Sequence, residues 1–303
     1  MIKIFLFLVI IIPCFGDVFT TPLGECTLEI YGGEVEDIPE IVKLIKEESR
    51  NLVETLGKVE TRPFSVYITL DMKDFYQKSK GPVPEWGIAV AKRNPDRAIL
   101  KAPGIANVSY PRMKEVIIHE LNHIYMFRIP QYGTMPSWFK EGMAMAASNE
   151  FSLLHKLEIS KSLWNETSLP LQRLHYFGRL PKNKIKLAYG ESAASIEALH
   201  YYYGEDISIL LLDKMREDLE FTEALELVIG EEYLEFRIKF EFYLEENYSW
   251  VFLLQSGNYL YVLMPLILVL GFWYKTYRNR LKLKQWEIEE AMEKSQWQDE
   301  LPN

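Results

Sequence analysis

The sequence predicts an α+β fold: a small mixed β-sheet, followed by a mainly helical part and by one C-terminal transmembrane helix. Short apolar segments of alternating character precede residue 110 and predict the strands. Apolar residues at helical spacing dominate residues 111–248. Residues 251–274 carry no Asp, Glu, Lys or Arg, which is typical of a membrane span. The expected parts of the chain are therefore residues 1–16, 17–110, 111–248, 251–274 and 275–303.

The region before residue 110 is expected to hold four strands and one long helix. Ile38–Leu56 has apolar residues at helical spacing, which predicts the helix. Residues 17–24 contain Thr, Pro and Gly and are expected to form a linker. The expected strands are Cys26–Tyr31, Phe64–Leu70, Gly87–Ala91 and Arg97–Lys101.

The most informative stretch is His119-Glu120-Leu121-Asn122-His123, on an expected helix over residues 111–128. Pro111 suits the first turn of that helix, and Pro130 ends it. Two His residues four positions apart lie on one helix face, so both imidazoles can reach one metal ion. Zinc accepts nitrogen and carboxylate ligands, and a catalytic zinc keeps its fourth position for water. Glu120 can reach that water as a general base. The alternative is a chance motif whose His side chains face solvent or core partners.

A second motif, Pro136-Ser-Trp-Phe-Lys-Glu-Gly-Met-Ala144, follows after a short segment. Ser137 is a suitable N-cap, so Glu141 falls near the start of a second helix. The short connection lets this helix fold back on the first. Gly142 and Ala144 permit close packing against another helix.

Together, the HExxH motif, the short loop and Pro-x-Trp-x-x-Glu-Gly-x-Ala resemble the gluzincin metallopeptidases, and in particular the bacterial peptidase MA-like domain. The resemblance implies a zincin-type metallopeptidase fold, a Zn²⁺ cofactor and a peptide or protein substrate. It also implies that His119, His123 and Glu141 are the metal ligands and that Glu120 is the catalytic base. It covers roughly residues 60–248, with specific motifs only at residues 119–123 and 136–144.

One position departs from the family pattern. Thermolysin-like relatives carry an acidic residue four positions after the ligand Glu, as a partner for a ligand His, whereas this chain has Met145. Another carboxylate, or a backbone carbonyl, must then orient the imidazole.

A peptidase of this type benefits from a second group that stabilises the oxyanion. Tyr189 is the best placed by its order along the chain, ahead of His175 and His200. The alternative for Tyr189 is a side chain packed at a helix start with its hydroxyl in water. The resemblance further implies an edge strand that binds extended substrate, expected at residues 97–101, for which a simple structural hairpin is the alternative.

Residues 1–16 are predicted to be a secretory signal peptide, cleaved after Gly16. One Lys precedes a short apolar run, and small residues then precede the expected cleavage site. An uncleaved N-terminal anchor is the alternative, whereas lipidation at Cys14 fits the sequence less well.

Residues 251–274 are expected to span the cell membrane once, with aromatic residues at both edges. Lys and Arg residues follow immediately, so the basic tail, residues 275–303, is expected in the cytoplasm. The peptidase domain is then extracytoplasmic. The alternative is a buried core helix.

The net charge of −9, with no basic domain, argues against nucleic acid as a partner. Cys26 is the one Cys outside the predicted signal peptide, so no intrachain disulfide is expected. Two other functions are compatible with the sequence. One is a catalytically inactive peptidase-like module that binds peptides or envelope protein partners. The other is a structural membrane protein that acts through its tail.

Overall fold

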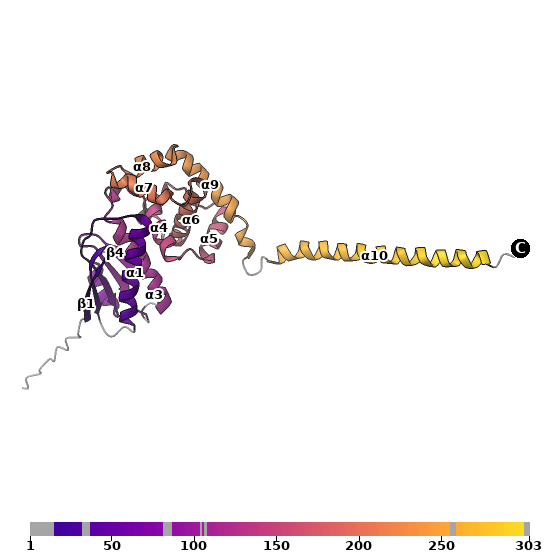
Figure 1. The fold of residues 1–303 in the computed structure, drawn as a ribbon, viewed down its shortest axis with the longest axis horizontal. Coiled ribbons are helices and arrows are strands. Elements are labelled where there is room, and N and C mark those ends of the chain that lie inside the picture. Colours follow the sequence, from indigo (N-terminus) through magenta and orange to yellow (C-terminus); the bar gives the residue numbers. More distant parts are fainter. Residues whose placement is uncertain are drawn as a thin grey trace, which may run out of the picture. The chain divides into compact units, whose positions relative to one another are not determined.

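Five strands form one mixed sheet in this computed structural model, which describes residues 15–31, 37–80, 87–103, 105, 108–254 and 259–299 (Figure 1). The order across the sheet is β1-β2-β3-β5-β4. The central strands β2, β3 and β5 are parallel, and the outer strands β1 and β4 are antiparallel to their neighbours. Their bounds are β1 Phe15–Thr21, β2 Gly24–Tyr31, β3 Phe64–Thr69, β4 Ala89–Lys92 and β5 Arg97–Lys101.

Alternation along β2 explains its place in the sheet. Cys26, Leu28 and Ile30 are buried, whereas Thr27 and Glu29 between them are partly exposed. Burial of alternate apolar side chains on one face fixes the register, because a slip of one residue would move every side chain to the other face.

The N-terminal edge differs from the expectation. Residues 17–24 are not a linker, because β1 pairs with β2 from Phe15 to Thr21. The turn between them is held by Thr21, whose hydroxyl oxygen accepts a hydrogen bond from Leu23 N at 3.1 Å, and Leu23 is fully buried. Residues 1–14 of the predicted signal peptide lie outside the described residues.

The other edge also differs. The prediction that residues 97–101 form the edge strand is wrong, because β5 lies between β3 and β4. Ala98, Ile99 and Leu100 are buried there. Among the described strands, β4 has one partner, β5, and is therefore the edge strand on this side.

Helices make up most of the remainder, as expected. Helix α3 lies at the junction, because it packs against β4 and β5, against α1 and against α4. Figure 1 shows α1 and α3 beside the sheet, with α4–α9 forming the helical part. The helices are α1 Ile38–Leu56, α2 Met72–Ser79, α3 Tyr110–Met126, α4 Ser137–Ser148, α5 Leu153–Trp164, α6 Ile185–Tyr203, α7 Ile207–Arg216, α8 Phe221–Ile229 and α9 Tyr233–Tyr248.

Helices α4 and α6 pack very closely. A Cβ atom at Gly142 on α4 would collide with the carbonyl oxygen of Ser192 and with Ile196 on α6. Gly142 thus permits a close approach, as expected, and the helix it approaches is α6. This contact fixes α6, which forms one wall of the site described below, against the helix that carries Glu141.

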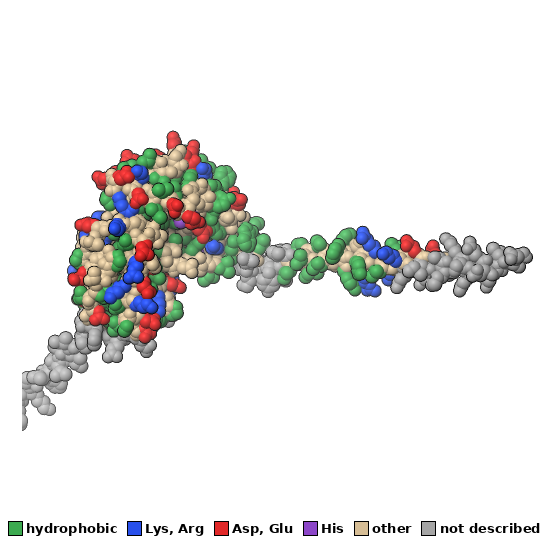
Figure 2. Space-filling view, in the orientation of Figure 1, with side chains coloured by type: hydrophobic (Ala, Val, Ile, Leu, Met, Phe, Trp, Pro, Cys, Tyr) green, Lys and Arg blue, Asp and Glu red, His purple; other side chains and the backbone are tan. Residues whose placement is uncertain are grey.

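The residues up to Ser249 form one compact unit, and those from Trp250 onward form another. The second unit contains a short 3₁₀ turn, η5 Val251–Leu254, and the 41-residue helix α10 Tyr259–Asp299. Figure 2 shows hydrophobic side chains on the first described part of α10, followed by Lys and Arg. Over the described residues, no helix combines the length and apolar character needed to cross a membrane. The predicted transmembrane helix over residues 251–274 is therefore unsupported, and its bounds do not match η5 and α10.

Candidate metal centre

Helix α3 carries both His residues of the HExxH motif. It begins as the sequence predicts, with Pro111 in its first turn and Ser109 as N-cap, whose hydroxyl oxygen accepts a hydrogen bond from Arg112 N at 3.3 Å. The two imidazoles lie on one face, and their Nε2 atoms are 3.2 Å apart. His123 is buried and His119 is partly exposed.

Helix α4 adds the third side chain. Glu141 Oε2 lies 3.5 Å from Nε2 of His119 and 3.5 Å from Nε2 of His123. The short connection from α3 to α4 makes this possible, because Phe127–Pro136 returns the chain beside α3 through one 3₁₀ turn, η1 Tyr132–Thr134. One ligand atom from each residue lies within 4.8 Å of the others. Among the described residues, no other group of three or more His, Cys, Asp or Glu side chains has this geometry.

These residues suit zinc. Two imidazole nitrogens and one carboxylate oxygen are the donors that a catalytic zinc site uses, with a fourth position left for water or substrate. Glu120 follows His119 on α3 and is buried. Its Oε2 atom has no hydrogen-bond partner among the described residues. A buried carboxylate oxygen without a partner is costly, so its retention beside this cluster favours a chemical role.

Glu150 is the residue that the sequence did not predict. Its Oε2 atom lies 2.6 Å from Nδ1 of His119, so the imidazole can donate to Glu150 and present Nε2 to the cluster. Arg112 contacts Glu150 Oε1 at 2.5 Å, and Ser148 Oγ donates to Glu150 Oε2 at 2.9 Å. Glu150 thus supplies the carboxylate that Met145 cannot.

The way α4 ends places Glu150 beside Nδ1 of His119. Asn149 adopts a left-handed conformation, with φ of 56°, and ends the helix. Glu150 N then donates to the carbonyl oxygen of Met145 at 3.1 Å, which turns the chain back toward α3. The signal in the sequence is an Asn that suits a helix C-cap followed by an acidic residue, a signal too general to identify the partner of His119.

The carboxylates determine the charge of this cluster. Burial lowers the pKa of His119, but hydrogen bonds to Glu141 and Glu150 outweigh it and raise this pKa to about 10. Burial raises the pKa of Glu150, but the His119 hydrogen bond and the charges of His119 and Arg112 lower it to about 2. The pKa of Glu141 is also lowered, because its interactions with the two His residues outweigh burial.

The pKa of Glu120 is raised, whereas those of Glu141 and Glu150 are lowered. Burial is the main cause of its raised pKa, the two His residues oppose it, and Glu141 and Glu150 add to it. A raised pKa makes Glu120 a stronger proton acceptor than an ordinary carboxylate, which suits a general base.

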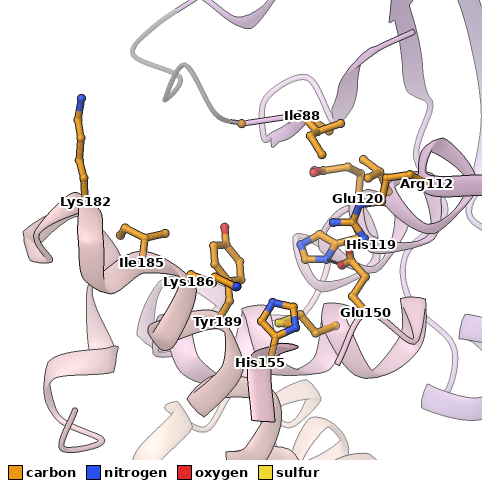
Figure 3. Close-up of a pocket in the computed structure, with 14 residues that line it drawn as sticks. Ile88, Arg112, His119, Glu120, Glu150, His155, Lys182, Ile185, Lys186 and Tyr189 are labelled. Atoms are coloured by element: carbon orange, nitrogen blue, oxygen red, sulfur yellow. Dashed lines mark hydrogen bonds and ion pairs between the residues drawn. The ribbon is translucent and has the colours of Figure 1, made fainter. Parts of the chain in front are cut away.

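A cavity of about 410 Å³ adjoins the cluster (Figure 3). Tyr189 on α6 points into it, on the side opposite Glu120. Burial raises the pKa of the Tyr189 phenol well above its usual value of 10.0, as do the charges of Glu141, Glu120 and Glu150. Tyr189 therefore stays protonated and can donate a hydrogen bond. The lining residues that matter below are Ile88, Arg112, Glu120, Lys182, Lys186 and Tyr189.

The remaining His residues lie elsewhere or are engaged otherwise. His200 Nε2 lies 3.0 Å from Ser208 Oγ, and His175 packs against Tyr176. Neither lines the cavity. His155 does line it, and its Nδ1 atom lies 3.1 Å from the Ser152 hydroxyl at the start of α5.

Comparison with known proteins identifies the family of the chain. The profile described as the Peptidase MA superfamily matches residues 46–243, whereas curated protein sequences gave no significant match. Among solved structures, an M1 zinc metallopeptidase from Deinococcus radiodurans is 14% identical, with a TM-score of 0.46 over 77% of this chain and 52% of that chain. An aminopeptidase N family protein from Idiomarina loihiensis is 10% identical, with a TM-score of 0.41 over 81% and 44%. The chain thus spans about half the length of these two structures. Because the profile covers the greater part of the chain, the protein belongs to the peptidase MA superfamily.

Proposed function

We propose that this protein is a zinc-dependent peptidase that hydrolyses peptide bonds. One observation carries the proposal: His119, His123 and Glu141 converge beside Glu120, whose Oε2 atom is buried and without a hydrogen-bond partner among the described residues. An inactive peptide-binding module would have no need of Glu120 in that place, because Glu120 is not one of the three clustered side chains.

His119, His123 and Glu141 would hold the zinc ion, which supplies polarisation of the substrate carbonyl and a lowered water pKa. Glu120 accepts the proton of the attacking water and then delivers it to the leaving amine. Glu150 keeps His119 in the tautomer that presents Nε2 to the cluster.

Tyr189 is the candidate for stabilising the oxyanion. Its phenol stays protonated and lines the cavity opposite Glu120. A hydrogen bond from this hydroxyl is worth most where negative charge develops in the transition state.

The edge strand β4 is the candidate for binding the peptide main chain. Gly87, Ile88 and Ala89 line the cavity, and Ala89 begins β4. An extended peptide can add to an exposed strand edge through main-chain hydrogen bonds. The sequence suggested residues 97–101 for this role, but these residues are not at the edge of the sheet. We therefore propose residues 87–92 instead.

For the location, we propose attachment to a membrane with the peptidase domain outside the cytoplasm. Two features support it: the apolar run within residues 1–16, and the large apolar side chains exposed on α10 between Leu263 and Tyr274, which basic residues follow. Fractionation of cells tests it. The full chain is expected with membranes and a chain ending at Ser249 in the soluble fraction, and recovery of the full chain in the soluble fraction contradicts the proposal.

Substitution of Glu120 by Gln tests the function. Glu120→Gln is expected to lower peptide hydrolysis at least about 100-fold, because the amide cannot accept the proton. Zinc content and thermal unfolding are expected to stay the same. Glu47→Gln, an exposed position on α1 that pairs with Lys43, serves as the control. Activity that survives in Glu120→Gln contradicts the mechanism.

A further inference from the structure

One stretch of the helical part of this acidic chain has basic residues and no acidic ones. Residues 167–190 contain no Asp or Glu, although the whole chain has 43 of them and a net charge of −9. The same stretch contains five basic residues: Arg173, Arg179, Lys182, Lys184 and Lys186. It runs from the loop after α5 to the first turns of α6, and its last part, from Lys182 onward, contributes to one side of the cavity.

Two of these cations line the cavity and two others are engaged elsewhere. Lys182 and Lys186 line it, on the side that also holds Tyr189 (Figure 3). Lys184 Nζ instead donates to the Thr167 carbonyl oxygen at 2.8 Å, and the Arg179 guanidinium lies 5.0 Å from the ring centroid of Tyr176. Lys182 and Lys186 are exposed, and no ion pair to either occurs within the described chain.

On the opposite side, Arg112, Glu150 and His119 are already paired with one another. Glu150 contacts both Arg112 and His119, and Arg112 also pairs with Glu115 at 2.8 Å. Glu120 is assigned to proton transfer. The cavity lining therefore combines paired charges near the metal cluster, Glu120 apart, with two lysines on the Tyr189 side that have no ion pair among the described residues.

From this arrangement we propose that Lys182 and Lys186 select peptide substrates that carry a carboxylate near the scissile bond. The proposal rests on the peptidase function and adds its substrate class. The carboxylate can belong to an Asp or Glu side chain or to the C-terminus of the peptide, because a Lys ammonium recognises both as a compact negative charge. The carboxylate would approach from the side of the cavity opposite Glu120 and Ile88.

Matched peptides test this preference with the zinc-loaded full chain. A peptide library with detection by mass spectrometry first identifies a cleaved bond. Internally quenched peptides then vary one position beside that bond as Glu, Gln or Lys, each with a free or an amidated C-terminus. The Glu peptide is expected to exceed the Gln peptide in kcat/KM by about 3- to 10-fold, mainly through KM, since partly exposed ion pairs are modest in strength.

Charge reversal connects the preference to the two lysines. The double variant Lys182→Glu, Lys186→Glu is expected to prefer the Lys peptide over the Glu peptide. Lys184→Glu is the matched control, because it makes the same kind of charge change in the same stretch but does not line the cavity. It is expected to keep the preference for Glu.

The results of these experiments distinguish the possible sources of the carboxylate and the possible failures of the proposal. A preference for Glu at an internal position assigns the carboxylate to a side chain, and a preference for the free C-terminus assigns it to the chain end. Equal cleavage of all peptides overturns the proposal while the peptidase function stands.

If nothing is cleaved, a binding assay decides the selectivity independently of turnover. In this assay, fluorescence anisotropy measures binding of the same peptides to the zinc-loaded Glu120→Gln variant. Loss of binding to anionic vesicles in the double variant, with peptide selectivity unchanged, also overturns the proposal, because the basic stretch then serves a membrane surface.

Discussion

His119 lies between two carboxylates that approach different nitrogen atoms of its ring. Glu141 approaches its Nε2 atom at 3.5 Å, and Glu150 holds its Nδ1 atom at 2.6 Å. Outer partners of this kind fix the ring orientation and raise the basicity of a ligand His. Zinc affinity should therefore depend on Glu150, even though Glu150 is not among the three proposed ligands.

We expect Glu150→Gln to lower zinc affinity about 10- to 100-fold. The amide oxygen can still accept from Nδ1, but the negative charge beside the imidazole is lost. Competition with a chelator measures the affinity, and Glu158→Gln on α5 is the control for a lost surface charge. An unchanged affinity would show that His119 needs no such partner.

At this scale the sequence predicts what is local. His119, Glu120 and His123 share one helix, so helical periodicity alone places them together. Glu141 requires only a short return between two helices. Glu150 could not be found in this way, because its position depends on the left-handed turn at Asn149 and on Arg112, a residue 38 positions away in the sequence (150 minus 112).

Among the elements, the α4–α6 contact connects Glu141, a proposed metal ligand, to the cavity wall that carries Tyr189. Gly142 faces the Ser192 carbonyl oxygen so closely that a methyl group has no room. We expect Gly142→Ala to lower the free energy of unfolding by about 1–3 kcal/mol, since the two helices must separate. Gly178→Ala is the matched control, because nothing lies within 4 Å of a Cβ atom there. Equal denaturation midpoints for the two variants would contradict the packing argument.

Glu191 on α6 gives the fold a pH dependence. Its side chain is fully buried and accepts the Leu169 N–H at 3.1 and 3.2 Å on its two oxygens. Burial raises its pKa to about 8, against the opposing effects of the Leu169 N–H, Lys184 and Ser162. Because this folded-state pKa exceeds the ordinary Glu value of 4.5, the unfolded chain loses the proton first as the pH rises. The associated stability is fully present below pH 4.5 and is lost as the pH rises through about 8.

We therefore expect Glu191→Gln to stabilise the protein at pH 8.5 and to change its stability little at pH 4.5. The gain is on the order of 1–3 kcal/mol, because one pKa unit corresponds to about 1.4 kcal/mol and the side chain relaxes in part. Urea denaturation of parent and variant at both pH values measures it. The same difference at both pH values would mean that Glu191 is ionised in the folded protein.

The elements themselves were predicted unevenly. The periodicity of α1 and the alternation of β2 appear directly in the sequence. Strand β1 was missed because Phe15–Thr21 directly follows an apolar run that indicates a signal peptide. The edge position of β4 was also missed, since strand order depends on pairing between distant segments and not on local pattern.

For the whole molecule, the order of strand-like and helix-like patterns along the sequence predicted an α+β fold, and that prediction is confirmed. The sequence pattern was less informative beyond Ser249. The apolar segment there lies partly in η5 and partly in α10, and α10 continues through the charged residues to Asp299. A window of local apolarity does not reveal that continuation, so membrane attachment stays a prediction.

The zinc content of the purified full chain, compared with that of His123→Ala, tests the central claim most directly. Three ligands from α3 and α4 predict about one zinc per chain in the parent. The variant, left with His119 and Glu141, should lose the metal on dialysis while keeping its helical content. No zinc in the parent after reconstitution with excess metal, or equal zinc in parent and variant, would contradict the assignment of this cluster as a metal centre.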